Sequence, residues 1–192
     1  MRLKEIEISG FKSFAKKASM PFDARVTSVV GPNGSGKSNV VEAFRFVLGE
    51  QSMKSMRGKS GSDLIFRGGA NAPKISRAAV SITFDNSDKI FAFGGENGSP
   101  ILFDTITFTR ELFVDGTSKY SMNGTEIRLK QMVEMLASVN IGTSTHHIIS
   151  QGEADGVLRA SARERREMLE DALGLKVIHI RIKESINKLT KA

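Results

Sequence analysis

Cysteine is absent from this 192-residue sequence, and no long apolar run occurs in it. Without cysteine there are no disulfide bonds and no thiolate metal sites. No segment approaches the roughly 18 uncharged apolar residues that a membrane-spanning helix needs, and the first residues lack the apolar core of a signal peptide. The simplest expectation is a cytoplasmic protein that does not span a membrane.

Charge is uneven, with 28 Lys and Arg against 21 Asp and Glu, a net charge of +7 and a pI near 9.8. Such an excess favours polyanionic partners, nucleic acid first and an acidic membrane surface second. A solvated basic surface is the alternative. Aromatic residues make up only 7% of the chain, and no base-reading motif or aromatic platform accompanies the charge. Charge alone therefore does not decide between these two interpretations.

The segment 31–38 reads Gly-Pro-Asn-Gly-Ser-Gly-Lys-Ser and fits the phosphate-binding P-loop pattern G-x-x-x-x-G-K-[ST]. Its three glycines permit backbone angles closed to other residues, so that successive N–H groups turn toward a phosphate. Lys37 is expected to reach the β- and γ-phosphates and Ser38 to offer its hydroxyl to Mg²⁺. The expected contacts to ATP in this segment are Pro32, Asn33, Gly34, Ser35, Gly36, Lys37, Ser38 and Asn39.

The flanks of this segment have the pattern that a P-loop requires. Residues 25–30 are β-branched and apolar, which predicts a strand running into the loop. Apolar residues then recur at helical spacing from Val40 to Leu48, and Gly49 stands where a helix C-cap belongs. An ordinary glycine-rich turn is the alternative, and eight motif positions together with both flanks argue against it.

Residues 78–127 alternate between apolar and polar side chains and predict an antiparallel β insertion that forms a side layer. Asp115-Gly116 and Asn123-Gly124 are both type I′ hairpin signals. A short helix is expected over 129–137. From Ser161, which forms a capping box with Glu164, the chain is expected to be helical and to begin a coiled coil with apolar positions Ile178, Ile182, Ile186 and Leu189. We therefore expect a lobe over 1–160 and a helical segment over 161–192.

A P-loop ATPase also needs an acidic residue at the end of a second apolar strand. The nearest candidate, Ile101-Leu102-Phe103-Asp104, is short, has no following acid and starts within the β insertion, so we interpret it as a chance match. Only one crossover helix is evident, whereas a parallel sheet needs several to cover both faces. Both deficits predict half of an ATPase, with the remaining strands and carboxylates supplied elsewhere.

Several segments, in order along nearly the whole chain, together resemble the N-terminal head segment of structural maintenance of chromosomes (SMC) proteins of prokaryotic type. They are Ile8-Ser9-Gly10-Phe11-Lys12-Ser13-Phe14, Gly31 to Asn39, Phe46-Val47-Leu48-Gly49-Glu50, Met56-Arg57, Asp63-Leu64-Ile65-Phe66, Gln151-Gly152-Glu153 and Glu164-Arg165-Arg166 with Ala172-Leu173-Gly174. The family commonly has two alanines before the last glycine. The implied fold class is α/β, a P-loop NTPase of ABC-ATPase type with an antiparallel β side layer and the start of a coiled coil.

The resemblance also implies roles for residues that are ambiguous by themselves. By position, Gln151 corresponds to the Q-loop residue and a ligand of the Mg²⁺ shell, although most glutamines at a strand end have neither role. Arg57 corresponds to the R-loop arginine, whereas its sequence context alone favours an exposed loop residue. Lys12 and Asp63 match segments near the nucleotide base. The implied catalytic residues are therefore Lys37, Gln151 and Arg57.

In this family two heads hold two ATP molecules between them, and hydrolysis separates the heads to drive DNA entrapment and chromosome segregation. The implied partners are the C-terminal half of the same head, a second head of the same kind, a kleisin subunit and double-stranded DNA without sequence preference, at the nucleoid. We expect little or no ATPase activity without the C-terminal half. A DNA-binding clamp with incidental turnover is the alternative, and a free-standing kinase lacks an evident acceptor site. Candidate DNA contacts are Lys54, Lys59, Lys74, Arg77, Arg163, Arg165 and Arg166.

Overall fold

A computed structural model describes residues 1–69, 72–94, 100–139, 141, 148–149, 160–172, 175, 182, 186 and 189–190. The chain divides into two compact units, Met1–Met132 and Val133–Ala192, and each is described here by itself. The sequence had suggested a boundary after residue 160. None of the described helices is long and apolar enough to cross a membrane.

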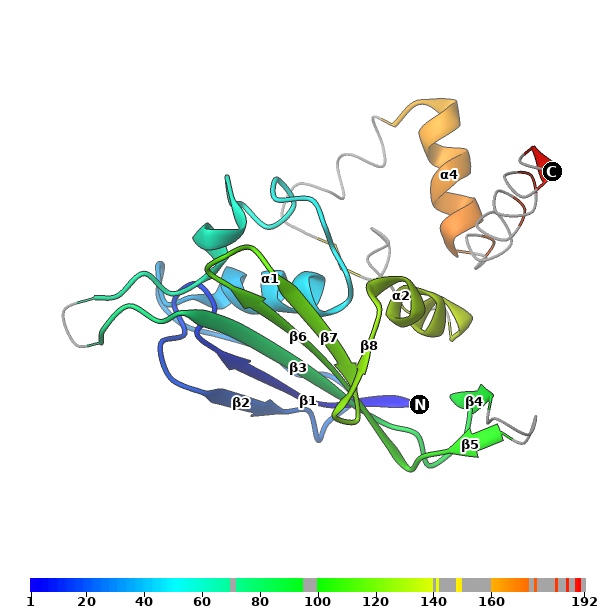
Figure 1. Ribbon diagram of the computed structural model, residues 1–192, viewed down its shortest axis with the longest axis horizontal. Coiled ribbons are helices and arrows are strands. Elements are labelled where there is room, and N and C mark those ends of the chain that lie inside the picture. The colour runs from blue at the N-terminus through cyan, green and yellow to red at the C-terminus, as the bar shows by residue number, and fades with distance from the viewer. Residues whose placement is uncertain are drawn as a thin grey trace. The chain divides into compact units, whose positions relative to one another are not determined.

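The first unit is built on a six-stranded antiparallel sheet with the order β2-β1-β3-β6-β7-β8 (Figure 1). Its strands are β1 (Arg2–Ser9), β2 (Ala18–Pro21), β3 (Arg77–Asp85), β6 (Thr105–Phe113), β7 (Ser118–Met122) and β8 (Thr125–Ile127). A separate pair is formed by β4 (Ala92–Gly94) and β5 (Pro100–Leu102). The β insertion predicted over 78–127 is confirmed, and β1 and β2, from the start of the chain, join the same sheet.

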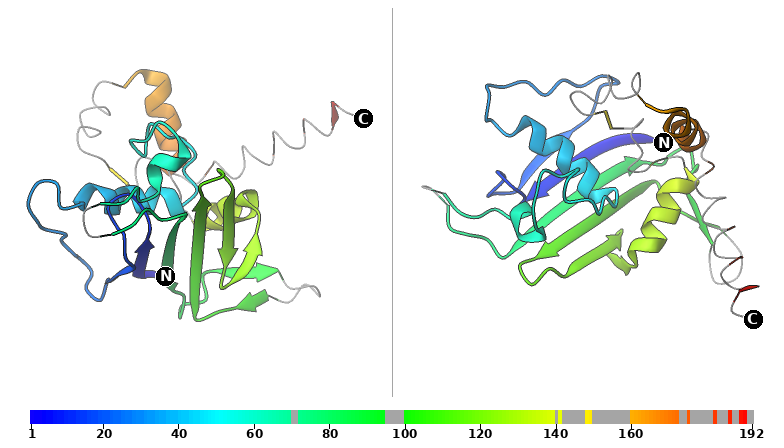
Figure 2. Two further views of the ribbon diagram at one scale, coloured as in Figure 1. Left: turned by 60° about the vertical axis from the view of Figure 1, so that its left-hand side comes forward. Right: turned by 90° about the horizontal axis from the view of Figure 1, so that it is seen from above.

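Helix α1 (Lys37–Val47) packs against β3 and β6 on one face of this sheet (Figure 2). The alternation of the strands explains the choice of face, because every second residue of β3 and β6 is buried. On the opposite face the hydroxyls of Ser81 and Thr109 lie 2.8 Å apart, and those of Thr83 and Thr107 lie 2.9 Å apart. The sheet thus has one apolar face against the helix and one hydroxyl-lined face.

The helix predicted after the P-loop ends as expected. Leu48 is its C-cap, and Gly49 follows with a φ of 98° in the left-handed region. Two other helical segments follow in the chain, the 3₁₀ helix η1 (Gly61–Leu64) and α2 (Leu129–Ser138). The helix expected over 129–137 is thereby confirmed, and Met132 and Leu136 are buried on it.

One of the two hairpin predictions was wrong in its turn type. At Asn123-Gly124 both residues have positive φ, 46° and 82°, as a type I′ turn requires. At 115–116 only Gly116 does, with φ of 87°. The Phe113 N–H donates to the carbonyl of Thr117 at 2.9 Å, so three residues lie between them instead of two. A three-residue loop that ends on a left-handed glycine fits this geometry.

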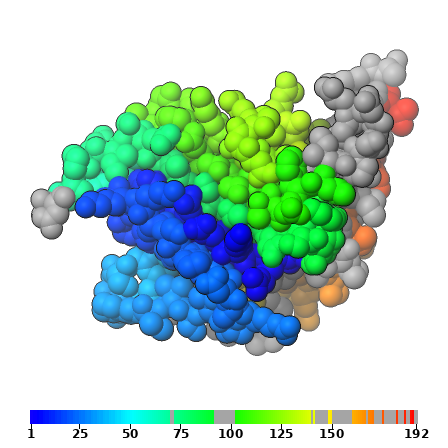
Figure 3. Space-filling model, turned by 90° about the horizontal axis from the view of Figure 1, so that it is seen from below, coloured from blue at the N-terminus to red at the C-terminus, as the bar shows by residue number. Residues whose placement is uncertain are grey.

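The strand predicted over residues 25–30 does not form. The segment has no regular secondary structure, and Val26, Val29 and Val30 are 83%, 48% and 88% exposed. A strand needs a hydrogen-bonded neighbour, and within the described residues no strand pairs with this segment. Figure 3 shows this stretch, in the lighter blue, on the surface of the unit.

In the second unit, α4 (Ala162–Ala172) begins with the predicted capping box. The Ser161 N–H donates to the Glu164 carboxylate at 2.7 Å, and the Glu164 N–H donates to the Ser161 hydroxyl at 3.3 Å. Arg166 pairs with Glu170 one turn later, at 2.7 Å. Of the predicted coiled-coil positions, Ile178 lies outside the described residues, and the other three are exposed.

Candidate nucleotide-binding site

The P-loop glycines have two different structural roles. Gly34 and Gly36 have φ of 82° and 92°, in the left-handed region that favours glycine. Gly31 does not, contrary to the expectation that all three glycines serve backbone conformation. A Cβ on Gly31 would lie 2.8 Å from the Ser35 hydroxyl oxygen, so a side chain at position 31 would require the Ser35 hydroxyl to move. The loop is thus tightly turned between residues 31 and 36.

The ammonium of Lys37 lies within this turn. Its Nζ donates to the carbonyl oxygens of Gly31 and Pro32, both at 2.6 Å. Gly36 is the N-cap of α1 and provides no side-chain cap, and of the first amides of the helix that of Asn39 donates to the Gly36 carbonyl at 2.9 Å. Ser38 is exposed on the first turn. A lysine ammonium, uncapped helix amides and an exposed hydroxyl together suit a phosphate with a bound divalent cation.

Ser13 belongs to this site, and the sequence analysis gave it no role of its own. Its hydroxyl accepts a hydrogen bond from the Asn39 amide at 2.8 Å. A Cβ on Gly36 would lie 2.7 Å from the same hydroxyl oxygen. Ser13 therefore packs directly on the P-loop backbone and holds Asn39, one of the predicted nucleotide contacts, in place.

Glu42 is a second residue that sequence reasoning missed. It lies on α1, it is 3% exposed, and its two carboxylate oxygens are bound by different cations. The ammonium of Lys12 binds one oxygen and Nε of Arg57 binds the other. Lys12 also donates to the carbonyl of Met56. The signal in the sequence was an acidic residue four positions after Ser38, on the same face of the helix.

Asp63 has a structural role in this structure. Its Oδ2 accepts the backbone N–H groups of Lys59 at 2.7 Å and Ser60 at 2.9 Å, and its Oδ1 pairs with Arg67. These contacts cap η1 and order the loop after Arg57. Contact with a nucleotide base stays a prediction for Asp63, as it does for Lys12.

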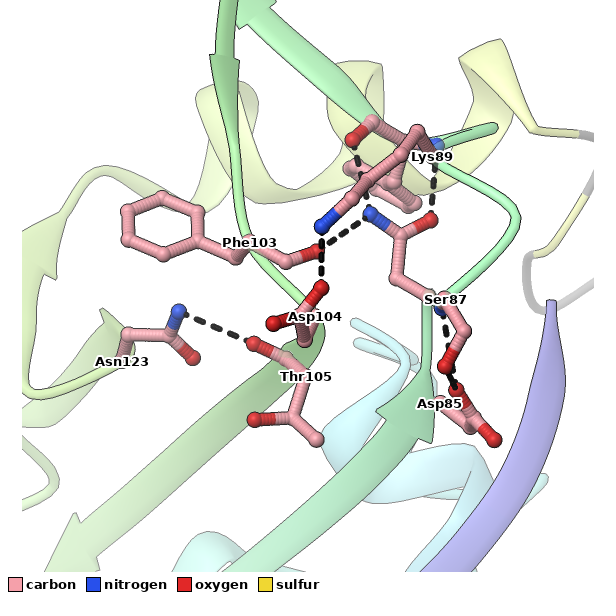
Figure 4. Close-up of polar contacts among 9 residues, drawn as sticks. Asp85, Ser87, Lys89, Phe103, Asp104, Thr105 and Asn123 are labelled. Atoms are coloured by element: carbon pink, nitrogen blue, oxygen red, sulfur yellow. Dashed lines mark hydrogen bonds and ion pairs between the residues drawn. The ribbon is translucent and has the colours of Figure 1, made fainter.

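Gln151 lies outside the described residues. Asp104, the acidic residue that the sequence analysis interpreted as a chance match, pairs with Lys89 beside the loop that carries β4 and β5, and its side chain is 82% exposed (Figure 4). The neighbouring Asn86 is fully buried and donates to the carbonyls of Phe91 and Phe103, which ties this loop together. Among the described residues, no three acidic or histidine side chains gather as a metal site.

Comparison with known proteins gives three findings. Residues 2–157 match the family model described as RecF/RecN/SMC N terminal domain. Over 91% of its length, this chain is 45% identical to the chromosome partition protein Smc of Lactiplantibacillus plantarum. The matched stretch is 14% of the length of that relative. Among solved structures, it matches one from work on ATP-driven dimerization and DNA-stimulated activation of SMC ATPases, with TM-score 0.78 and 35% identity over 89% of this chain and 99% of the other.

A second solved structure is the Smc head domain from Pyrococcus furiosus, which has an extended coiled coil and is bound to the C-terminal domain of ScpA. It superimposes with a TM-score of 0.81 and 34% identity over 99% of this chain and 46% of the other. These likenesses confirm the predicted fold class, the ABC-type ATPase half-head with its antiparallel side layer and the start of a coiled coil.

Proposed function

Because this chain belongs to the RecF/RecN/SMC N-terminal domain family, we propose that it is the ATP-binding half of an SMC head that becomes an active ATPase when a C-terminal half completes it. The completed head would pair with a second head on ATP and separate after hydrolysis, in the service of chromosome segregation. This role would be performed at the nucleoid, where the DNA lies.

One observation carries the proposal of an incomplete head. The segment that enters the P-loop is apolar and β-branched, yet Val26 and Val30 are more than four-fifths exposed. Such side chains and an unpaired backbone favour pairing with a further strand. Burial of the two valines would contribute about 1.5–3 kcal/mol each. A C-terminal half that adds strands beside residues 25–30 supplies that burial and orders the loop that follows.

The P-loop residues present fit ATP and Mg²⁺. In our proposal Lys37 binds the β- and γ-phosphates, the amides of Gly34 to Ser38 surround them, and the Ser38 hydroxyl holds Mg²⁺ together with Gln151. The metal would neutralise charge on the transferring phosphoryl group. Pro32, Asn33 and Asn39 complete the loop, and Arg57 would contribute the second cationic contact.

The proposed partners follow from the relatives and the charge. The Smc head of P. furiosus is bound to the C-terminal domain of ScpA, and we propose a kleisin of that kind for this chain. The net charge of +7 supports an interaction with the DNA backbone. Phosphate contacts would make DNA affinity fall steeply with salt, and a flat salt response would count against DNA binding by this chain.

Steady-state ATP hydrolysis tests the proposal. The chain is assayed alone and with a matching C-terminal half, with Lys37→Ala as the site variant and Lys17→Ala, which removes an exposed partner of Glu7, as the matched control. We expect no turnover by the chain alone, and turnover on complementation that Lys37→Ala abolishes and Lys17→Ala leaves unchanged. Robust Lys37-dependent turnover by the isolated chain would mean that it holds a complete active site.

A second assay tests the ATPase proposal on the completed protein. If Lys37→Ala abolished ATP binding and left all DNA-dependent behaviour intact, neither ATP binding nor hydrolysis would drive that behaviour, and the proposal would fail.

A further inference from the structure

Two cations of this chain converge on one buried carboxylate beside the P-loop. Glu42 is 4% exposed at its side chain and engages Lys12 through one oxygen and Arg57 through the other. The two cations come from segments far apart in sequence, 30 residues before Glu42 and 15 residues after it. Both carboxylate oxygens are therefore committed to positioning side chains.

The position of Glu42 on α1 directs this cluster toward the candidate nucleotide site. Ser38 and Glu42 are four residues apart, so they share a helix face and lie about 6 Å apart along the axis. A helical side chain points back toward the N-terminus of its helix, here toward the P-loop. The Glu42 carboxylate, with the two cations that bind it, is therefore directed toward the end of α1 that carries the P-loop.

The backbone at both cations supports a functional arrangement. Lys12 and Arg57 have φ of 47° and 48°, two of the four positive values found at non-glycine residues in the described chain. Such conformations cost free energy and persist where surrounding contacts impose them. Here the contacts are visible, because Lys12 binds both Glu42 and the carbonyl of Met56, the residue before Arg57.

The two cations differ in how tightly they are held. Lys12 is 13% exposed at its side chain, whereas Arg57 is 64% exposed and docks on Glu42 through Nε. Lys12 is thus a fixed counterion. The outer edge of the Arg57 guanidinium stays available, and the triad carries a net charge of +1, which a phosphate can neutralise.

We propose that Glu42 is a positioning residue that holds Arg57, with Lys12 as its fixed counterion, in place to contact the phosphates of a nucleotide on the P-loop. This inference rests on the proposed function, because it requires that the P-loop binds ATP. Glu42 itself does not touch the nucleotide and acts through Arg57.

A double-mutant cycle tests the proposal with the 192-residue chain and a fluorescent ATP analogue. Glu42→Gln removes the charge and keeps the shape, Arg57→Ala removes the positioned cation, and the double variant combines them. We expect each single variant to weaken binding about tenfold, the loss for one charge-assisted hydrogen bond. The double variant should also lose about tenfold, because Glu42 acts only through Arg57. A hundredfold loss in the double variant, or no loss in Glu42→Gln, would overturn the proposal.

Controls separate this result from misfolding and from failure of the proposed site. Glu7→Gln, which removes a partner of exposed Lys17, should leave binding unchanged. If Glu42→Gln fails to fold, Glu42→Asp keeps a charge for Lys12 on a side chain too short to reach both cations, and the same cycle is run with it. If the parent chain alone does not bind the analogue, the cycle is run after addition of the matching C-terminal half, which the proposed function expects to order the loop. Binding that is absent or insensitive to Lys37→Ala in both preparations overturns the ATP site and this inference together. Lys37-dependent binding with additive losses overturns the inference alone.

Discussion

The guanidinium of Arg110 on β6 lies over the ring of Phe46 on α1, with 4.2 Å between its Cζ and the ring centroid. The same guanidinium donates through Nη1 to the carbonyls of Phe46 at 2.9 Å and Glu50 at 2.6 Å. Burial lowers the pKa of Arg110, and the neighbouring Tyr120 and Glu50 oppose that effect. A cation from the sheet thus satisfies carbonyls at the C-terminal end of the P-loop helix.

Replacement of Arg110 by Met should destabilise the fold. The change removes a charged donor from both carbonyls, which keep only the longer bonds from the Gly49 N–H at 3.2 Å and the Gln51 side-chain amide at 3.4 Å. It also removes a cation–π contact, so we expect the free energy of unfolding to fall by about 3 kcal/mol. Urea denaturation of the chain measures this. Arg77→Met is the matched control, because Arg77 forms an exposed ion pair with Glu111 at 2.8 Å, and it should cost no more than about 1 kcal/mol. Equal losses in the two variants would contradict the assigned role of Arg110.

Gly36→Ala should weaken ATP binding more than Gly34→Ala. Both residues have left-handed backbones, which cost a non-glycine residue about 1–2 kcal/mol. Only the new Cβ at Gly36 meets a neighbour, the Ser13 hydroxyl at 2.7 Å, while the space beside Gly34 is open. Titration with a fluorescent ATP analogue compares the two.

A second substitution isolates the steric part of the Gly36 effect. Ser13→Ala removes the hydroxyl that the new Cβ meets. The double variant Gly36→Ala/Ser13→Ala should therefore bind the ATP analogue more tightly than Gly36→Ala alone. Ser13→Ala alone gives the cost of losing the Asn39 hydrogen bond. If the double variant binds the ATP analogue no more tightly than Gly36→Ala, the backbone conformation at residue 36, and not the contact with Ser13, determines the loss of affinity.

The exposed valines before the P-loop should be dispensable for folding and necessary for completion of the head. Because Val26 and Val30 are 83% and 88% exposed, the double change to Ser should alter the free energy of unfolding of the isolated chain by less than about 0.5 kcal/mol. ATPase activity recovered by adding the C-terminal half should fall. Val80→Ser, at a fully buried position of β3, should instead cost about 3 kcal/mol. Undiminished complementation by the Val26 and Val30 double variant would argue against a partner strand there.

The capping box of α4 should weaken in acid. The N–H and hydroxyl of Ser161 lower the pKa of Glu164 from 4.5. A lowered folded-state pKa means that the carboxylate stabilises the helix start above pH 4.5, and that this contribution is lost as the pH falls through the folded-state pKa. NMR titration of the carboxyl should give a midpoint below 4.5, with hydrogen exchange at the Ser161 amide speeding up, relative to its intrinsic rate, over the same range. Glu164→Gln should abolish that pH dependence of protection, and its persistence in this variant would exclude Glu164 as the titrating group.

Much of the fold was predictable because it depends on local patterns. The alternation in β3 and β6, the helical spacing after Ser38 and the Asn-Gly turn at 123–124 each specify a conformation within a few residues. The turn at Asp115-Gly116 was not predictable to its type, since Asp-Gly fits a two-residue loop as well as a three-residue one. The strand at 25–30 failed for a different reason, because its formation depends on a neighbour that the described chain does not provide.

The candidate site divides in the same way. The sequence by itself determined the P-loop, since eight consecutive residues carry its glycines, lysine and hydroxyl, and it indicated Arg57 through a family resemblance. Only the tertiary structure decided that Lys12 and Arg57 meet on Glu42, that Ser13 packs on Gly36, and that Arg110 is buried at the end of α1. These contacts join residues between 15 and 64 positions apart. No local periodicity encodes such pairs, because they arise only when sheet register and helix packing bring distant segments together.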